Sequence, residues 1–266
     1  FLYNTNNLIK INMGTIKPYL MEQSDRSFAV DDKDAQSFAN GILILGSYAA
    51  DVVGKFTFRK NTEPANFRNL YDENENTIVY NSQRYVITNT RLNPNIFCGK
   101  GNIVLRTTAG TLTITDHYLV SSLSLNQMDQ TVDTLEDNFL YNFSNLKSID
   151  FQYLPNISTI GKNFMYGCKN LKELDLSSFT NITSIDTSFL FECDELVNIN
   201  MGNISADVMA ESDNTFSVNN ASSKAHLNGI ILAGNYKDAI QNKFQARTQA
   251  PYRKWRAESK PLDNFI

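Results

Sequence analysis

A chain of 266 residues in which 42% are hydrophobic is long enough to bury a sizeable core, which excludes a disordered tail. The formal net charge of −4 and the pI near 5.3 provide no overall basic field, which argues against nucleic acid as a partner. No apolar run reaches the ~18 residues that a membrane span needs. The longest, residues 41–53, is interrupted by Asp51, so we expect no membrane span in this chain.

Residues 1–56 align without a gap to residues 189–244, and 20 of these 56 pairs are identical. The run Ile-Asn-Met-Gly, for example, starts at Ile11 and again at Ile199. The chain also begins with Phe1 in mid-pattern and lacks a starting Met. We interpret it as a piece of a longer tandem array with a period of about 188 residues, in which residues 1–72 are the C-terminal part of a preceding module.

Residues 73–118 carry a β pattern. We expect strands at 77–80 and 84–88 around a short turn, and a hairpin that pairs 102–106 with 110–115. Apolar and polar residues alternate in these runs, as in half-buried strands. The sequence therefore predicts a β-rich linker followed by an N-terminal cap.

A 25-residue repeat dominates residues 119–210, because 139–151 recurs as 164–176 and as 189–201. Such self-similarity indicates stacked units. One coil cannot offset its own ordering entropy, so each needs a neighbour. A degenerate earlier unit is expected around Leu123 and Leu135. The repeated apolar columns are Phe139, Phe164 and Phe189; Phe143, Cys168 and Cys193; Leu146, Leu171 and Leu196; Ile149, Leu174 and Ile199; and Phe151, Leu176 and Met201.

Three cysteines, including Cys98, are too few for a disulfide framework. Cys168 and Cys193 share a column, and stacking at ~5 Å would place them within reach of a disulfide. The same column holds Phe143, so it is a packing position. We favour two buried free thiols, with a disulfide as the alternative.

Residues 211–266 are expected to form a C-terminal cap and the start of the next linker. A β-like run at 229–233 precedes a helical pattern of apolar positions. These positions are Tyr236, Ala239, Ile240, Lys243 and Phe244.

The pattern Phe-x-x-x-Cys-x-x-Leu-x-x-Leu-x-Leu that starts at Phe164 resembles the BspA-like (Treponema pallidum-type) leucine-rich repeats of spirochaete and oral-bacterial surface proteins. Residues 181–187 are also similar to mollicute repeat lipoproteins. The resemblance covers about residues 98–260, plus a partial copy at 1–60. Ile160-Gly161 matches its usual Ile-Gly step, which becomes Ile185-Asp186 in the next unit.

This resemblance implies an α/β, β-dominated leucine-rich repeat solenoid. It also implies an N-terminal β-hairpin cap at 98–114 and a C-terminal helical cap that includes residues 252–255. Together with the longer period, it predicts tandem modules of about 188 residues.

No catalytic constellation is visible. The two histidines, His117 and His226, lie in neither a metal-binding nor a nucleophile pattern, so we expect no enzyme activity, no metal site and no cofactor.

Polar residues of the strand columns form an outward ladder. Hydrogen bonding between coils is the favoured explanation, and calcium coordination or contact with a protein are the alternatives. The candidate ligand-binding residues are Lys147, Asp150, Lys172, Glu173, Asp175, Asn198 and Asn200.

These features predict a non-enzymatic extracellular or cell-surface protein of bacterial type that mediates adhesion or protein recognition. Its partner would be a protein or another cell-surface ligand, and self-association along the array is possible. The alternative is a structural component of a filament, appendage or virion assembled through the repeat faces. A mixed polar strand face favours reversible recognition over assembly.

Overall fold

The structure is a computed structural model. It describes residues 1–8, 10–21, 24, 26–32, 34–35, 37–38, 41–57, 66–67, 70–72, 76–88, 92–99, 101–126, 128–151, 156–245 and 256–257. Two separate hydrophobic clusters form its core, one within residues 1–72 and a larger one that runs from residue 78 to residue 244. The predicted cap residues 252–255 lie outside the described part of the chain.

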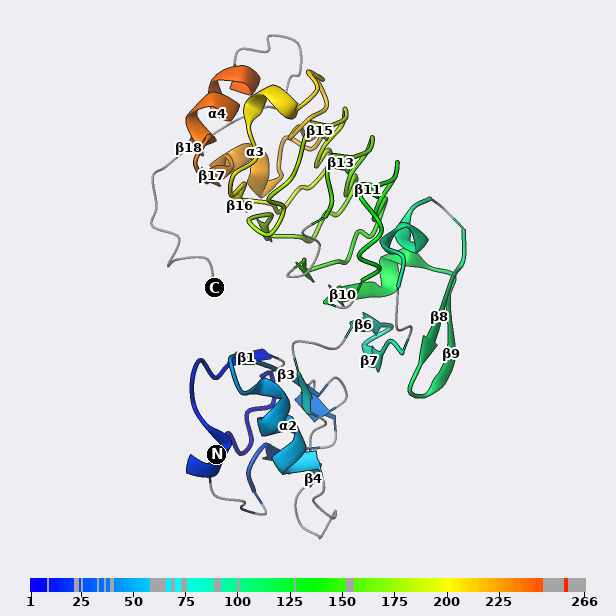
Figure 1. The fold of residues 1–266 in the computed structure, drawn as a ribbon, viewed down its shortest axis with the longest axis vertical. Coiled ribbons are helices and arrows are strands. Elements are labelled where there is room, and N and C mark those ends of the chain that lie inside the picture. The colour runs from blue at the N-terminus through cyan, green and yellow to red at the C-terminus, as the bar shows by residue number, and fades with distance from the viewer. Residues whose placement is uncertain are drawn as a thin grey trace.

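Short strands dominate the fold, as predicted (Figure 1). The strands are β1 (Lys10–Asn12), β2 (Ala29–Val30), β3 (Ile42–Leu45), β4 (Asn66–Phe67), β5 (Leu70–Asp72), β6 (Thr77–Tyr80), β7 (Gln83–Val86), β8 (Ile103–Thr107), β9 (Gly110–Ile114), β10 (Val120–Ser124), β11 (Thr134–Leu135), β12 (Ser148–Asp150), β13 (Thr159–Ile160), β14 (Glu173–Asp175), β15 (Ser184–Ile185), β16 (Asn198–Asn200), β17 (Ile231–Ala233) and β18 (Arg256–Ala257). The α-helices are α2 (Ala49–Thr57), α3 (Lys224–Asn228) and α4 (Lys237–Gln245), and the 3-10 helices are η1 (Pro18–Leu20), η2 (Pro94–Phe97), η3 (His117–Leu119) and η4 (Ala206–Val208).

The β structure predicted before the repeats is present. β6 pairs antiparallel with β7 and with β10, and β8 pairs antiparallel with β9 in a hairpin. In Figure 1 this hairpin projects at the end of the coil stack opposite α4. The ring of His117 stacks on Phe143 with centroids 4.8 Å apart, so this histidine serves packing.

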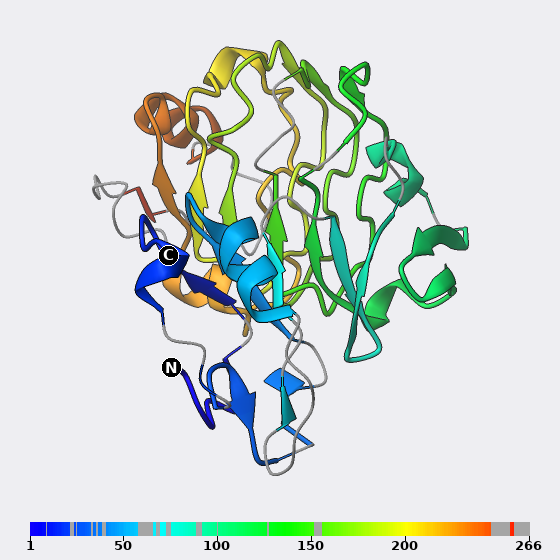
Figure 2. The same cartoon turned by 60° about the horizontal axis from the view of Figure 1, so that its bottom comes forward.

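The 25-residue units form parallel strands on two sides of each coil. On one side β11, β13 and β15 pair so that Thr134, Thr159 and Ser184 are direct partners (Figure 1). On the other side β10 pairs with β12, and β14 pairs with β16. The pair Leu123 and Ile149 confirms the degenerate first unit. Figure 2 shows the coils following one another from green to yellow, with α4 in orange beyond them.

The second sheet is interrupted between β12 and β14. The strand orders are β12-β10-β6-β7 and β14-β16-β17-β18, so no ladder joins these two neighbouring strands within the described residues. The ring of Phe179 packs on Phe151 at 5.1 Å beside this interruption, and the Ser178 hydroxyl donates to the Phe151 carbonyl at 2.7 Å. Side-chain packing therefore continues where backbone pairing stops.

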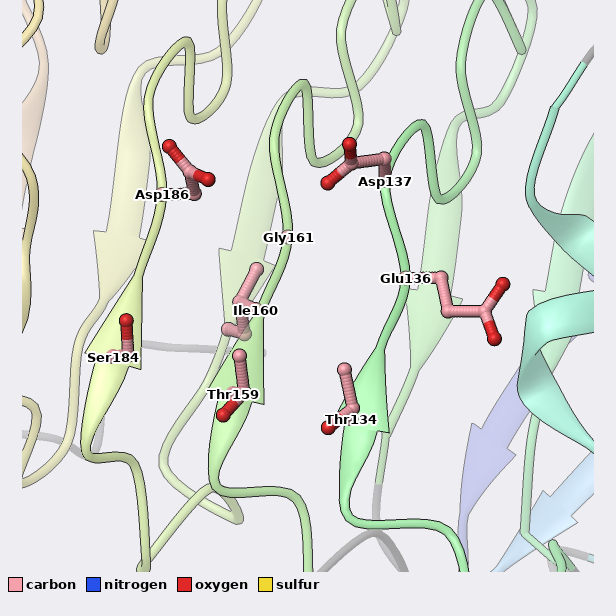
Figure 3. Close-up of a pocket in the computed structure, with 8 residues that line it drawn as sticks. All are labelled: Thr134, Glu136, Asp137, Thr159, Ile160, Gly161, Ser184 and Asp186. Atoms are coloured by element: carbon pink, nitrogen blue, oxygen red, sulfur yellow. The ribbon is translucent and has the colours of Figure 1, made fainter.

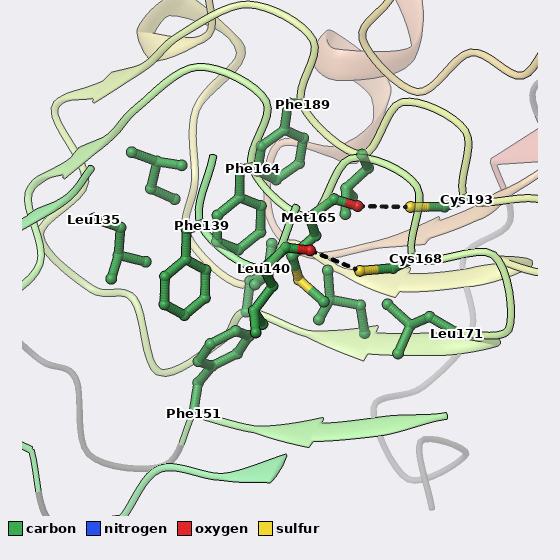
Figure 4. Close-up of a cluster of buried hydrophobic side chains, with 14 of the residues drawn as sticks. Leu135, Phe139, Leu140, Phe151, Phe164, Met165, Cys168, Leu171, Phe189 and Cys193 are labelled. Carbon is green, nitrogen blue, oxygen red and sulfur yellow. Dashed lines mark hydrogen bonds between the residues drawn. The ribbon is translucent and has the colours of Figure 1, made fainter. Parts of the chain in front are cut away.

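A column of stacked phenylalanines lies at the centre of the hydrophobic core of the repeats (Figure 4). The ring centroids of Phe139 and Phe164 lie 5.7 Å apart, and those of Phe164 and Phe189 lie 5.1 Å apart, with interplanar angles of 11° and 8°. All three side chains are fully buried. Each coil therefore covers an aromatic ring of the next one.

Cys168 and Cys193 are buried free thiols, which confirms the favoured prediction. Their Sγ atoms donate to the carbonyl oxygens of Leu140 and Met165 at 3.4 and 3.3 Å (Figure 4). Burial raises the pKa of both thiols. Half-buried Cys98 is also free, and burial raises its pKa to about 12. These thiols pack and stay protonated at neutral pH.

The segment around each core phenylalanine alternates into the left-handed region. Asn163, Met165 and Gly167 have φ of 60°, 53° and 73°, and the same positions of the neighbouring coils also have positive φ. This geometry lets the Met165 amide donate to the carbonyl of Phe139 at 2.8 Å, and the Leu190 amide donate to that of Phe164 at 3.0 Å. Neighbouring coils are thus bonded through the backbone on this side too.

Gly161 allows a close approach between coils. A Cβ there would lie 2.7 Å from the backbone nitrogen of Asp137, whose Oδ1 accepts from the Lys162 amide at 2.8 Å. In the next unit Asp186 accepts from the adjacent Thr187 amide at 2.5 Å instead. Replacing the glycine therefore changes the turn and leaves the fold intact.

Contacts recur at the 188-residue spacing. The ring of Phe28 packs edge-on against Phe56 at 5.1 Å, and that of Phe216 packs edge-on against Phe244 at 5.5 Å. β1 pairs with β3 in the register in which β16 pairs with β17. This recurrence agrees with the predicted period, while the division of the chain into tandem modules stays a prediction.

Candidate functional site

The strand face is defined here as the outer surface of β12, β14 and β16 with the residues directly before these strands. It carries the candidate ligand-binding residues. Lys147, Lys172, Glu173 and Asp175 are exposed, Asp150 and Asn198 are half-buried, and Asn200 is buried.

The two polar residues that end β14 and β16 close their own turns. Oδ1 of Asp175 accepts from the Ser177 amide at 2.8 Å, and Oδ1 of Asn200 accepts from the Gly202 amide at 3.0 Å. Asn200 is only 2% exposed. Its buried amide is held in the turn and is not presented to solvent, unlike the outward position that its sequence column predicts.

A side-chain hydrogen bond links two ladder residues of neighbouring coils. Nδ2 of Asn198 donates to Oε1 of Glu173 at 2.9 Å, so this pair realises the expected bonding between neighbouring strands. Lys147 and Lys172 stand directly before β12 and β14, and neither forms an ion pair with a described residue. The charged residues of the strand face are therefore Lys147, Lys172, Glu173 and Asp175, which are exposed, and Asp150, which is half-buried.

A second polar surface covers the opposite sheet. A pocket of about 460 Å³ lies over β11, β13 and β15. Figure 3 shows the hydroxyl side chains of Thr134, Thr159 and Ser184 in a row, with Asp137 and Asp186 above them. The lining residues are Thr134, Glu136, Asp137, Thr159, Ile160, Gly161, Ser184 and Asp186.

The described residues that line the pocket include acidic side chains and no lysine, arginine or histidine. One carboxylate oxygen of Asp137 is engaged by the Lys162 amide, and Asp186 by the Thr187 amide. Within the described part of the chain, no group of three histidine, cysteine or acidic side chains could hold a metal ion. The pocket therefore offers hydroxyls and negative charge to a polar or cationic group.

The apolar columns of the sequence do not predict this pocket. A signal existed, because Thr134, Thr159 and Ser184 follow each other at 25-residue spacing, each directly before a buried Leu or Ile. Polar residues at a fixed period beside a core column indicate an ordered outer row.

The repeat geometry agrees with a match to a family model. The model of the BspA type leucine-rich repeat region matches residues 87–236 in 6 copies, which is more than half of the chain. The chain belongs to the BspA-type leucine-rich repeat family. The resemblance that began at Phe164 is thereby confirmed.

BspA-type leucine-rich repeat domains are typically non-enzymatic, mediate protein interactions and are generally surface-associated. No curated protein and no solved structure matches this chain significantly. In the part of this BspA-type chain that the structure describes, no helix is both long and apolar enough to cross a membrane.

Proposed function

We propose that the chain is a non-enzymatic recognition protein, extracellular or on the cell surface, whose strand face binds a protein or another cell-surface ligand. Lys147 and Lys172 carry the proposal, because both are exposed beside adjacent strands and neither is neutralised by a described residue. Two exposed positive charges that no described residue pairs favour a partner that supplies negative charge. Adhesion is the role this arrangement supports best.

A binding assay tests the proposal directly. The chain is applied to an array of purified extracellular-matrix and serum proteins, with and without Lys172→Glu. Reversal of the charge of Lys172 is expected to weaken the binding affinity for a captured ligand about tenfold or more, largely through faster dissociation.

Lys162→Glu is the matched control, because Lys162 is also exposed and lies outside the strand face. An equal loss of binding with Lys172→Glu and Lys162→Glu would indicate a net-charge effect and contradict the proposal. If only Asp186→Lys reduced binding, the binding site would be the acidic pocket instead.

We infer further that the chain is part of a tandem array of modules of about 188 residues. Within it, residues 1–72 would end one module, 73–118 would link and cap, 119–210 would carry the repeats and 211–266 would close the second module. Several contacts within residues 1–57 recur within residues 189–245, which supports this division. Several modules on one chain would raise avidity by presenting several strand faces.

The structural alternative, a filament or appendage component, is favoured by one observation. Large apolar side chains are exposed within residues 1–20, where soluble surfaces are usually polar. They are Phe1, Ile16, Tyr19 and Leu20. If these residues mediate assembly between copies, sedimentation should show concentration-dependent oligomers that Leu20→Asp abolishes.

A further inference from the structure

Equivalent residues of the same type differ in burial between two related segments. Residues 1–57 are called the first segment and residues 189–245 the second segment. Phe1 is 53% exposed whereas Phe189 is fully buried, and Ile16 is 45% exposed whereas Ile204 is 2% exposed. Three further identical pairs follow the trend, since the member in the first segment is half-buried and its counterpart is buried. They are Leu2 and Leu190, Leu8 and Leu196, and Ile11 and Ile199.

One coil, residues 164–188, covers the face of the second segment that is equivalent to the exposed face of the first. The ring of Phe164 stacks on Phe189 at 5.1 Å. Strand β14 pairs in parallel with β16, and the Leu176 amide donates to the Asn200 carbonyl at 2.8 Å. The coil thus buries the second segment through ring stacking and a strand ladder.

The first segment keeps the shape that receives such a coil. β1 is the outer strand of the sheet β1-β3-β5, whereas β16 lies between two strands. Phe1 meets Phe28 edge-on at 5.3 Å, as Phe189 meets Phe216 at 5.4 Å. The open face is the name used here for Phe1, Leu2, Leu8, Ile11 and Ile16 with the edge of β1 that pairs with no described strand.

We propose that the open face is a docking site for a leucine-rich coil of the kind formed by residues 164–188. The coil would be joined to Phe1 as Ser188 is joined to Phe189. This inference rests on the proposed tandem array and specifies the contact by which one module continues into the next.

A coil from a second copy fits less well, because the coils within this chain are already covered by their successors. The coil that starts at Phe189 is followed by β17 and α4. A coil in the same polypeptide also avoids the entropy cost of association. The docked coil would stack a phenylalanine on Phe1, pair a parallel strand with β1 and place an amide at the Asn12 carbonyl.

Hydrogen exchange on a lengthened chain tests the proposal. A second copy of residues 73–188 is inserted directly before Phe1, so that the full chain 1–266 is retained. Backbone amides of residues 11–16 should then exchange at least about tenfold more slowly and approach the rates of residues 199–204 in the same molecule. Unchanged exchange of residues 11–16 beside a protected insert would overturn the proposal.

The control insert carries Phe164→Asp and Leu174→Asp, and it should give no protection to residues 11–16. If the long insert itself exchanges at unfolded rates, residues 119–188 are inserted instead. Failure of both inserts to protect the open face also overturns the proposal. Ligand capture by the strand face is measured on the same proteins, so that loss of docking is distinguished from loss of the proposed recognition function.

Discussion

Residues 1–57 and 189–245 share several internal contacts in different surroundings. The Lys55 ammonium donates to the carbonyls of Pro18 and Met21, and Lys243 donates to the equivalent carbonyls 188 positions later. Aromatic packing repeats as well. The burial of the face beside β1 and β16 differs between the two segments. The comparison shows that contacts within a segment follow its own sequence, whereas burial depends on the neighbouring coil.

The largest difference in the cost of a substitution is expected between the first phenylalanines of the two segments. Phe189→Ala should lower the free energy of unfolding by about 3–5 kcal/mol, because it empties a fully buried stack. Phe1→Ala should cost less than ~1 kcal/mol, because half of that ring is already in water. Urea unfolding with hydrogen exchange measures both. Equal costs would show that the two faces are equally covered.

The glycine turns should respond alike in both segments. A Cβ on Gly46 would lie 2.5 Å from the Gly14 carbonyl oxygen, and one on Gly234 would lie 2.7 Å from that of Gly202. Both have φ near +116°, so alanine should cost more than ~1 kcal/mol at either site. Thermal unfolding measures the loss. Gly54→Ala is the control, since its helical site has open space and should gain slightly.

Removal of the ammonium group of Lys55 or Lys243 should lower stability by a smaller amount, and by a similar amount in both segments. Lys55→Met and Lys243→Met each remove a charged donor from two carbonyls, which should cost about 1–3 kcal/mol. Local hydrogen exchange around η1 and η4 measures the change. Lys162→Met, at an exposed site, should have almost no effect. A loss of exchange protection in only one segment would show that the two segments are not equivalent.

Alkaline pH should separate the segments. Burial raises the pKa of Cys168 and Cys193 above the unfolded value of ~8.5, so unfolded chains lose these protons first as the pH rises. Stability of the repeats should therefore be complete below pH ~8.5 and fall above it. Thr5 takes the place of Cys193 in the first segment. Unfolding is compared between pH 7 and 10, and a Cys168→Ala/Cys193→Ala variant should lose this component.

Much of the fold could be predicted because the 25-residue columns state which side chains share a layer. Phe164, Leu171 and Leu174 are buried as expected, and the helical pattern after Tyr236 forms α4. The left-handed conformation of Leu140 and Met165 could not be predicted, since residues with a Cβ disfavour it. There the bonds between coils outweigh local preference.

The candidate site was predictable only in part. Exposure of Lys147 and Lys172 follows from charge, and both are indeed exposed. Burial of Asn200 does not follow, because a polar residue two positions before a glycine can either face a ligand or close its own turn. Pairing of Glu173 with Asn198 required the register of β14 on β16. The acidic pocket depends on three coils at once, which single positions do not reveal.

Each coil begins and ends at the same point of the cross-section, since Thr134, Thr159 and Ser184 are partners at whole periods of 25 residues. A recombination event that removes or adds one period would leave every remaining residue in its original register. The two ends of the stack would keep their covers, and only the length of the polar rows would change. The gene can therefore vary the size of both surfaces in single steps without a compensating mutation elsewhere.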